Sequence, residues 1–423
     1  MANRRNVFYS IIIFCLLMGW LSGRNFLFHL AYALITVLVA AFIWSWTSVN
    51  WVTISRYTHA RRAQVGRSLD EVFTIRNTGI LPKLWLEIRD HSTLPNHHAS
   101  HVVPTLGPRR RYGWETHTIC IRRGAYTLGP MTVVSGDPFG LFQFPRKIPA
   151  VSSIIVYPPT VPIHRFATPI GTLSGGEAVR RRTVYVTTNA AGVREYQPGD
   201  SFNRIHWRSS ARKDQLLVKE FELDPLADVW IFLDLSLSSL VERPQARADN
   251  GGYIYSTAPS LPPSTEEYAI SIAASLAQYF VNKGRALGFL TYSPHREIIQ
   301  PDRGPRQLTR ILEILAVARS ENELSLQQVL GLEANYLTRG TTAVLVTASM
   351  DEAWVAEVHT LARRGIRVIA VILDPRSFGA ANANVMQVRQ MAEAAGAVVY
   401  VVQQDDDLTA ALSYRTNLAP RPF

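Results

Sequence analysis

The stretch Val229-Trp-Ile-Phe-Leu-Asp-Leu-Ser-Leu-Ser238 starts with five apolar residues and then places polar side chains at every second position. A short, continuous apolar run is typical of a strand that is buried on both faces of a sheet. From here onward, apolar runs alternate with amphipathic segments. This alternation predicts a doubly wound α/β domain over residues 223–423, with a mainly parallel sheet that helices cover on both faces. The predicted strands are 229–233, 286–292, 343–347, 368–373 and 398–402, and the predicted helices are 264–283, 307–318, 352–364 and 385–395.

Three polar residues, Asp234, Ser236 and Ser238, directly follow the first predicted strand. Ligands of doubly wound sheets collect at the carboxyl ends of the strands, which is where this D-x-S-x-S pattern falls. The pattern resembles the metal-ion-dependent adhesion site of von Willebrand factor A domains. That resemblance implies an A-like fold and a Mg²⁺ ion held by carboxylate and hydroxyl oxygens. The competing interpretation is that Asp234 and its serines cap the next segment.

Two departures from the adhesion-site pattern count against a metal. Where that pattern has an acidic residue after the fourth strand, this chain has Thr347-Ala-Ser349, and Asp351 comes two residues late. The helix entry at residues 304–309 lacks an aligned threonine. One carboxylate and two hydroxyls make a weak cage for a divalent cation.

The segment 192–222 precedes the α/β domain and is rich in charge. Gln197-Pro-Gly-Asp200 has the composition of a type II turn, and Asp200 can cap the residues after it. Arg204, Arg208 and Arg212 recur every four residues, so a helix would place them on one stripe. We expect these arginines to form ion pairs that pin two domains together, and an anion-binding or catalytic stripe is the alternative. The nearby acidic residues are Glu195, Asp200, Asp214, Glu220 and Glu222.

The run REYQPGDSFNRIHWRSSAR, residues 194–212, closely resembles the signature of the bacterial domain-of-unknown-function family fifty-eight. Residues 122–130 and 136–142 look like two further stretches of that family. The resemblance implies a membrane-anchored protein with a von Willebrand factor A-like domain, often encoded beside a MoxR-type AAA ATPase. It implies no established activity. The signature residues are Arg194, Glu195, Tyr196, Pro198, Gly199, Asp200, Arg204, His206, Trp207, Arg208 and Arg212.

Residues 48–160 show short runs with period-two alternation, separated by turn residues. This pattern predicts an all-β, sandwich-like domain. His97, His98 and His101 lie close together in a polar stretch, and we expect a solvated loop rather than a metal site because no cysteine or fourth ligand accompanies them. Residues 161–191 read as a linker, since their glycine-rich part lacks the Lys-Ser/Thr pair of a phosphate-binding loop.

The N-terminal residues 1–47 predict a transmembrane hairpin of two helices. Residues 7–23 and 26–46 carry no charge, and a bilayer span needs about 20 such residues. A signal peptide is the alternative for the first segment, but no small-residue cleavage site precedes the second. Basic residues flank both outer ends of the hairpin, so the positive-inside rule places both termini and the soluble domains in the cytoplasm. Cys15 and Cys120 offer no disulfide framework, as expected in a reducing compartment.

The charge of the chain is uneven. Its 423 residues carry a formal net charge of +11, with 27 Lys and Arg against 12 Asp and Glu in residues 1–222 and 17 against 21 in residues 223–423. The basic half also holds the hairpin, so anionic lipid headgroups are its expected partner. Nucleic acid is the competitor, but the basic residues are dispersed and no nucleic-acid-binding signature is present.

Together these observations predict a membrane-anchored interaction or scaffold protein rather than an enzyme. By resemblance, its partners would be a MoxR-type AAA ATPase and other envelope proteins. The alternative is an enzyme acting on an anionic substrate, with His206 as general base and Arg204, Arg208 and Arg212 as the anion site. No nucleophile elbow, zinc-binding helix, kinase set or dinucleotide fingerprint accompanies His206.

Overall fold

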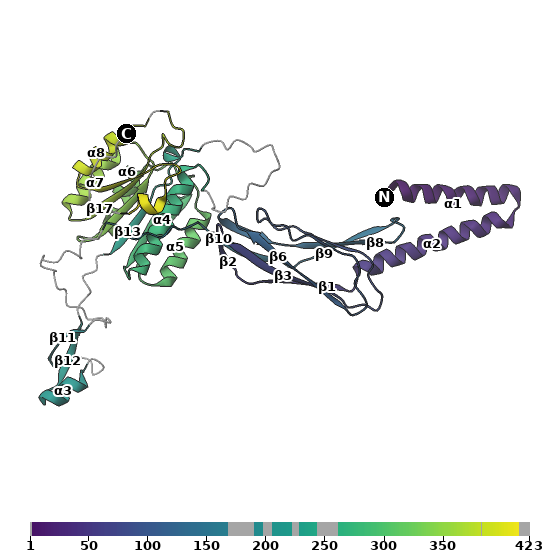
Figure 1. Ribbon diagram of the computed structural model, residues 1–423, viewed down its shortest axis with the longest axis horizontal. Coiled ribbons are helices and arrows are strands. Elements are labelled where there is room, and N and C mark those ends of the chain that lie inside the picture. Colours follow the sequence, from purple (N-terminus) through teal and green to yellow (C-terminus); the bar gives the residue numbers. More distant parts are fainter. Residues whose placement is uncertain are drawn as a thin grey trace. The chain divides into compact units, whose positions relative to one another are not determined.

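The computed structural model describes residues 2–167, 190–197, 205–221, 228–242, 261–381 and 383–413. The chain forms two compact units that divide after Pro159. The first holds the N-terminal helices and a β domain, and the second holds an α/β domain (Figure 1). The structure therefore has the mixed architecture of helices and sheets that the sequence predicted, with two apolar helices at the N-terminus.

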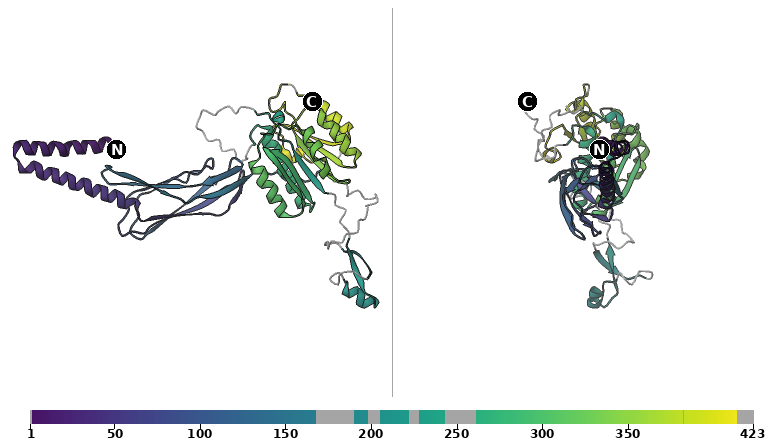
Figure 2. Two further views of the ribbon diagram at one scale, coloured as in Figure 1. Left: turned by 180° about the vertical axis from the view of Figure 1, so that it is seen from behind. Right: turned by 90° about the vertical axis from the view of Figure 1, so that its right-hand side faces the viewer.

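Two antiparallel helices open the chain, α1 (Ala2–Ser22) and α2 (Asn25–Val49). Gly23 has a φ of 63° in the turn between them, a conformation that glycine adopts without strain. Both helices are long and apolar enough to cross a membrane, and most of their side chains are exposed in the structure. Figure 2 shows α2 leading directly into the β domain.

The β domain contains three sheets, with strand orders β1-β3-β6, β2-β10-β7 and β5-β4-β8-β9. Every pair of neighbouring strands is antiparallel except β2 and β10. The main core joins Phe73 and Ile75 of β3 to Leu86 of β4 and Met131 of β8, so two sheets contribute to it, as the sandwich prediction requires. The strands are β1 (Val52–Thr58), β2 (Arg62–Gln64), β3 (Ser68–Asn77), β4 (Leu86–Asp90), β5 (His101–Val103), β6 (Arg111–Ile119), β7 (Gly124–Leu128), β8 (Met131–Gly136), β9 (Gln143–Ile148) and β10 (Ser152–Tyr157).

The α/β domain is built on one six-stranded sheet of order β15-β14-β13-β16-β17-β18. All neighbours are parallel except β14 and β15, which form an antiparallel edge. Helices α4 and α5 contribute to the core on one face, and α6, α7 and α8 contribute to the core on the other. The strands are β13 (Val229–Leu233), β14 (Leu287–Ser293), β15 (His295–Asp302), β16 (Thr342–Thr347), β17 (Arg367–Leu373) and β18 (Val398–Val402).

The predicted helices of this domain are confirmed as α4 (Thr265–Asn282), α5 (Pro305–Val317), α7 (Ala353–Arg363) and α8 (Val385–Ala394). The edge strand β15 and the short helices α6 (Leu326–Glu333) and α9 (Leu408–Ala411) were not predicted. The start of the predicted linker is also ordered against this domain. Phe166 stacks on Tyr400 with ring centroids 4.7 Å apart, and the backbone N–H of Ala167 donates to the Tyr400 hydroxyl. The rest of that linker, up to residue 189, lies outside the described residues.

The described part of the signature segment forms two strands and one helix, which Figure 1 labels β11, β12 and α3. Strands β11 (Ala190–Glu195) and β12 (Leu217–Phe221) pair antiparallel, and helix α3 (Trp207–Lys213) lies between them in the chain. Residues 198–204 and 222–227 lie outside the described residues.

Candidate functional site

Asp234 occupies the point in the sheet where the strand order reverses. It follows the last residue of β13, and the adjacent strand β16 ends at Thr347. Strand β13 lies between β14 and β16, which come later in the chain on opposite sides of it. Ligands of open α/β sheets bind at such a switch point, outside the carboxyl ends of the strands.

Within the described part of the chain, the groups that bind the carboxylate of Asp234 are neutral. Its Oδ1 accepts from the backbone N–H of Ser236 at 3.0 Å, and its Oδ2 accepts from the Thr347 hydroxyl at 2.6 Å. Ser238 Oγ donates to Ser236 Oγ at 3.2 Å. The structure therefore brings the three predicted residues together and adds Thr347, the last residue of β16.

Asp234 is 8% exposed, and none of the described Lys, Arg or His side chains forms an ion pair with it. Burial raises the pKa of Asp234, and the hydrogen bonds from Thr347 and Ser236 oppose that rise. A charged carboxylate in this position lacks a compensating cation from the described protein groups. Its own carboxylate oxygens and the hydroxyl oxygens of Ser236, Ser238 and Thr347 are of the kind that hard divalent cations prefer as ligands.

The two positions that depart from the adhesion-site pattern lie in different places. Asp351 lies just before α7, where its Oδ1 accepts from the backbone N–H of Ala353 at 3.0 Å and its own N–H donates to Ser349 Oγ at 3.3 Å. Residues 304–309 begin α5 at the opposite end of the sheet, because Asp302 pairs with Leu287, the first residue of β14. Among the described residues, no three His, Cys, Asp or Glu side chains gather as a metal site. Among the described residues, Asp234 is therefore the carboxylate that a cation site here would use, together with the neighbouring hydroxyl groups.

Two of the three arginines of the predicted stripe, Arg208 and Arg212, lie on helix α3. The helix begins at Trp207, and Ile205 before it forms a β-bridge with Val218. Pro198, Gly199, Asp200 and Arg204 themselves lie outside the described residues. His206 caps α3: its Nδ1 accepts from the backbone N–H of Ser209 at 3.1 Å.

Arg208 and Arg212 are exposed, and neither forms an ion pair with another described residue. The prediction that both are held in a buried network is therefore not supported by the described contacts. Trp207, next to them, is 64% exposed. This helix presents basic and aromatic side chains to its surroundings, as a contact surface would.

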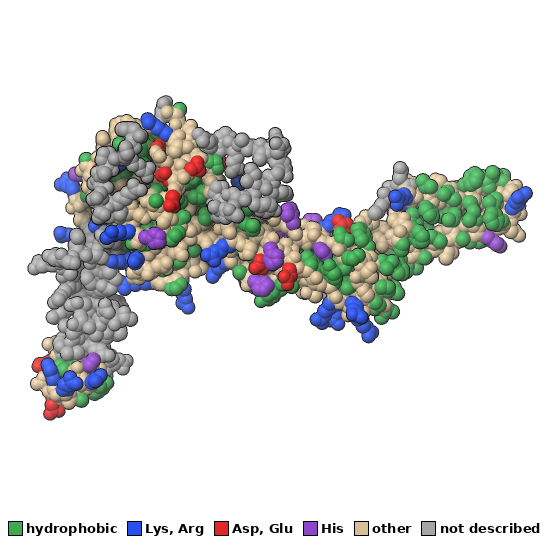
Figure 3. All heavy atoms as spheres, in the orientation of Figure 1, with side chains coloured by type: hydrophobic (Ala, Val, Ile, Leu, Met, Phe, Trp, Pro, Cys, Tyr) green, Lys and Arg blue, Asp and Glu red, His purple; other side chains and the backbone are tan. Residues whose placement is uncertain are grey.

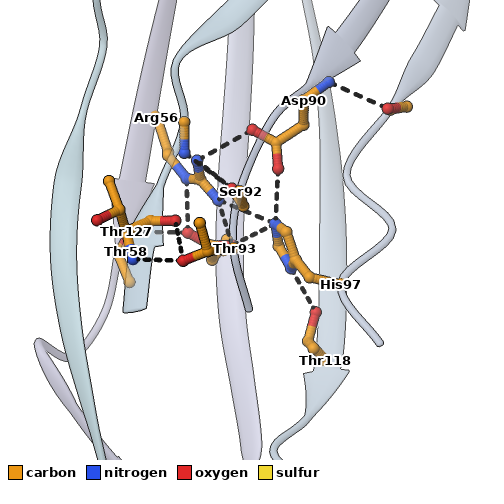
Figure 4. Close-up of polar contacts among 11 residues, drawn as sticks. Arg56, Thr58, Asp90, Ser92, Thr93, His97, Thr118 and Thr127 are labelled. Carbon is orange, nitrogen blue, oxygen red and sulfur yellow. Dashed lines mark hydrogen bonds and ion pairs between the residues drawn. The ribbon is translucent and has the colours of Figure 1, made fainter. Parts of the chain in front are cut away.

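The structure also contains a buried charge network that the sequence did not predict (Figure 4). Arg56 on β1 binds Glu71 on β3 through two N–H donors, with Nε to Oε1 at 2.7 Å and Nη2 to Oε2 at 3.0 Å. Arg56 Nη1 also lies 3.3 Å from Asp90 Oδ1 at the end of β4. The side chains of Arg56, Glu71 and Asp90 are at most 4% exposed.

His97 belongs to this network, so its assignment to a solvated loop was wrong. Its Nε2 lies 3.2 Å from Asp90 Oδ2 and 3.4 Å from Glu71 Oε2, while its Nδ1 lies 2.8 Å from Thr118 Oγ1. His101, on β5, stacks on the ring of Tyr112 on β6. His98 is exposed. The three histidines therefore have three different environments.

The network reads as a structural feature. Buried charges persist in proteins when they are paired and hydrogen-bonded, and each ionisable group here has such partners. The alternation of the strands in the sequence places two charged members of this network, Arg56 and Glu71, on the buried face of the sheet. Glu71 has the same parity along β3 as the buried Leu69, Phe73 and Ile75, and Arg56 has the same parity along β1 as Val52.

Comparison with known proteins points to one family. The family described as "Protein of unknown function DUF58" matches residues 192–251, which include the signature segment and Asp234. The uncharacterized protein YeaD of Bacillus subtilis (strain 168) is 24% identical over 207 residues. That match covers 48% of this chain and 44% of YeaD, so the chain matches less than half the length of its relative.

Similar solved structures cover about a quarter of the chain. The CARDB domain of a Pyrococcus furiosus protein is 14% identical, with 25% of this chain and 91% of that domain covered and a TM-score of 0.19. A FixG-related protein from Vibrio parahaemolyticus is 10% identical, with 26% and 98% covered and a TM-score of 0.18. Over residues 192–251 the chain is similar to the DUF58 family, whose description names no activity.

Proposed function

We propose that this chain is a membrane-anchored interaction protein whose α/β domain carries a cation-dependent contact site at Asp234. The observation that carries the proposal is the buried Asp234 carboxylate at the switch point of the sheet, with neutral donors around it. A divalent cation there would compensate the charge and leave coordination positions for an acidic group of a partner. The von Willebrand factor A-like fold belongs to this proposal and is supported by the strand order and by the D-x-S-x-S pattern.

The residues that would hold Mg²⁺ are Asp234, Ser236 and Ser238, with Thr347 holding the carboxylate in place. The cation would supply a Lewis-acid centre that binds a carboxylate oxygen from another protein. We propose a MoxR-type AAA ATPase as the partner, and this choice rests on the family resemblance. The exposed face of α3, with Trp207 and Arg208, would be a second contact with the same partner.

The anchor in this proposal is the pair α1 and α2, with both termini in the cytoplasm. The support is their length and apolar composition, together with the basic residues outside their ends. The enzyme alternative has less support, because His206 Nδ1 already accepts the helix-capping hydrogen bond. A cytoplasm-specific reporter fused after Phe423 would be active in this orientation.

Chemical crosslinking and capture from membranes, with Mg²⁺ or with a chelator, tests the proposal. The unmodified chain should capture a partner in Mg²⁺ and lose it in the chelator. Asp234→Asn should remove capture in both conditions, while Asp228→Asn, at the other end of β13, should not. Equal capture by the unmodified chain and Asp234→Asn would contradict the proposed site.

A further inference from the structure

Exposed apolar side chains gather at the end of the β domain where α2 enters it. Ile80 is 75% exposed, and Leu81, Leu84 and Trp85 are exposed in the same loop, residues 78–85. Trp51, which follows α2, is 49% exposed and packs edge-to-face with Trp46 of the helix. Loops on the surface of a soluble domain are usually polar, so an apolar loop of this length is unusual.

The loop is fixed in place by the helix end. The backbone N–H and the hydroxyl of Thr78 both donate to the Trp51 carbonyl, each at 2.7 Å. The ammonium group of Lys83 is buried and donates to the carbonyl of Thr47, in the last turn of α2. Asn77 Nδ2 donates to the Leu81 carbonyl at 2.8 Å. The apolar side chains are therefore presented by an ordered backbone beside the last turn of α2.

A basic turn lies next to this loop. Arg109, Arg110 and Arg111 are exposed, and the Arg110 carbonyl accepts from the backbone N–H of Asn77, which directly precedes the loop. Arg76 is exposed as well and is paired with Arg111 across β3 and β6. None of these four arginines forms an ion pair with another described residue. Figure 3 shows basic and hydrophobic side chains together at this end of the domain.

A second loop of the β domain reaches the same helix. The ring of Phe142 packs edge-to-face on Phe42 of α2, with centroids 5.5 Å apart, and Ser45 Oγ donates to the Phe142 carbonyl. Phe139, in this loop between β8 and β9, is 58% exposed. The loop backbone is folded around the buried Asp137, whose carboxylate accepts from the N–H groups of Phe139 and Leu141. Two ordered loops thus flank the last turns of α2 with apolar side chains.

We propose that residues 78–85 and the turn Arg109–Arg111 form a membrane-binding edge that recognises anionic lipid headgroups. The apolar side chains enter the boundary between headgroups and acyl chains, and the arginines bind lipid phosphates. This inference rests on the proposed membrane anchorage of α1 and α2. It adds a specific lipid contact that holds the β domain against the surface of the bilayer.

Two observations favour lipid over a protein as the occupant. The apolar edge is continuous with the exposed apolar surface of α2, through Trp46 and Trp51. Tryptophans at the end of a spanning helix lie at the membrane interface, so the neighbouring loop is at the same level. The uncompensated charge of the arginines also has the sign that phosphate headgroups require.

The test uses the full chain in lipid vesicles, with a spin label on Ile80→Cys. Relaxation by oxygen reports an apolar surrounding, and relaxation by a nickel chelate reports water. The native Cys15 and Cys120 are buried, and the parent chain without the new cysteine gives the labelling background. A label on Ile119→Cys is the matched control, because Ile119 is exposed and pairs with Ser68 at the other end of β3, about 30 Å away along the strand.

In vesicles of phosphatidylcholine mixed with phosphatidylglycerol, the label at position 80 should prefer oxygen and the label at position 119 should prefer the nickel chelate. Replacing Arg109, Arg110 and Arg111 by Gln should reduce the oxygen preference at position 80. The unsubstituted arginines should likewise give a smaller oxygen preference at position 80 when the vesicles contain phosphatidylcholine alone. A matched triple replacement of Arg61, Arg67 and Arg122, which lie toward the other end of β3, should leave the preference unchanged.

Retention of the protein on vesicles after an alkaline carbonate wash separates this inference from the anchor itself. Retained protein with a water-exposed label at position 80 overturns the membrane-binding edge and leaves the anchor standing, as would be expected if a protein occupied the edge. An oxygen preference that is the same with and without phosphatidylglycerol overturns the anionic-lipid contact. Loss of the protein in the wash overturns both proposals.

Discussion

The β domain and the α/β domain both bury aspartate carboxylates, but they compensate the charge in different ways. In the β domain, Asp90 lies within 3.3 Å of Arg56 and within 3.2 Å of His97. In the α/β domain, Asp234 contacts a hydroxyl and a backbone N–H. Burial acts on both groups. It raises the pKa of Asp234, whereas for Asp90 the hydrogen bonds from His97 and Ser92 and the charge of Arg56 outweigh burial and lower the pKa.

This difference separates a structural group from a candidate binding group. A buried carboxylate that already pairs with protein cations does not need an ion from solution to compensate its charge. Its removal would mainly damage the fold. A buried carboxylate without a cation carries a desolvation cost that an ion from solution could remove. Both residues are buried aspartates, so burial and residue type do not distinguish them. The lack of a compensating cation among the described residues is what marks Asp234 as the candidate site.

The largest expected effect comes from removing the cation of the β-domain network. Arg56→Met should destabilise the β domain by about 3 to 5 kcal/mol, because two buried carboxylates lose their partner. Hydrogen exchange of the amides in β1 and β3, measured on the full chain in detergent, reports the free energy of opening. Arg89→Met is the control: Arg89 pairs with Glu87 at the surface, where solvent screens the pair, so its loss should have a much smaller effect. Equal effects of the two substitutions would contradict the distinction.

The next effect concerns the uncompensated carboxylate. A cation that binds only the folded chain stabilises it by about 2.7 kcal/mol at 100 times its dissociation constant. Mg²⁺ should therefore raise the melting temperature of the α/β domain, and Asp234→Asn should abolish that shift. Without Mg²⁺, Asp234→Asn should be at least as stable as the unmodified chain, since the amide carries no charge to desolvate. A shift that survives in Asp234→Asn would place the cation elsewhere.

Acid should affect the β-domain network through Asp90. Its pKa is lower in the folded chain than in the unfolded chain. The stabilisation from this group is therefore complete above the ordinary pKa of about 3.9 and is lost as the pH falls through the folded value. Asp90→Asn should flatten the acid limb of β-domain stability in hydrogen-exchange measurements between about pH 5 and pH 2. An unchanged acid limb would mean that Asp90 is not coupled to folding.

Most of the α/β fold followed from sequence patterns. Five continuous apolar strands and four amphipathic helices were found because their periods are clear and their bounds are marked by turns. Strand β15 was missed because it is an edge strand with residues such as His295 and Arg296 at its start, and its apolar content is low. Helix α6 was missed because it has only eight residues.

The site was less predictable than the fold. Asp234, Ser236 and Ser238 are neighbours in the sequence, so their spacing was sufficient to group them. Thr347 is 113 residues from Asp234, and only the parallel pairing of β13 and β16 brings them together. The Arg56 network could not be predicted because its members come from separate segments, and because Arg56 and Glu71 occupy inward positions of their strands, where apolar side chains are the rule.

The smallest expected effect on stability concerns the signature helix α3. Its arginines Arg208 and Arg212 are exposed to solvent, unlike the buried charges at Asp90 and Asp234. Arg208 is exposed on α3 and has no ion pair with another described residue, so Arg208→Ala should change stability by no more than about 0.5 kcal/mol. His206→Ala removes the cap of α3 and should cost more, about 1 kcal/mol. Partner capture should show the reverse order, because the guanidinium lies on the exposed face and the imidazole is used within the segment. Hydrogen exchange of α3 and crosslinking from membranes measure the two quantities on the same variants. A loss of stability in Arg208→Ala comparable to that in Arg56→Met would restore the structural network predicted from the sequence and would remove α3 from the proposed contact surface.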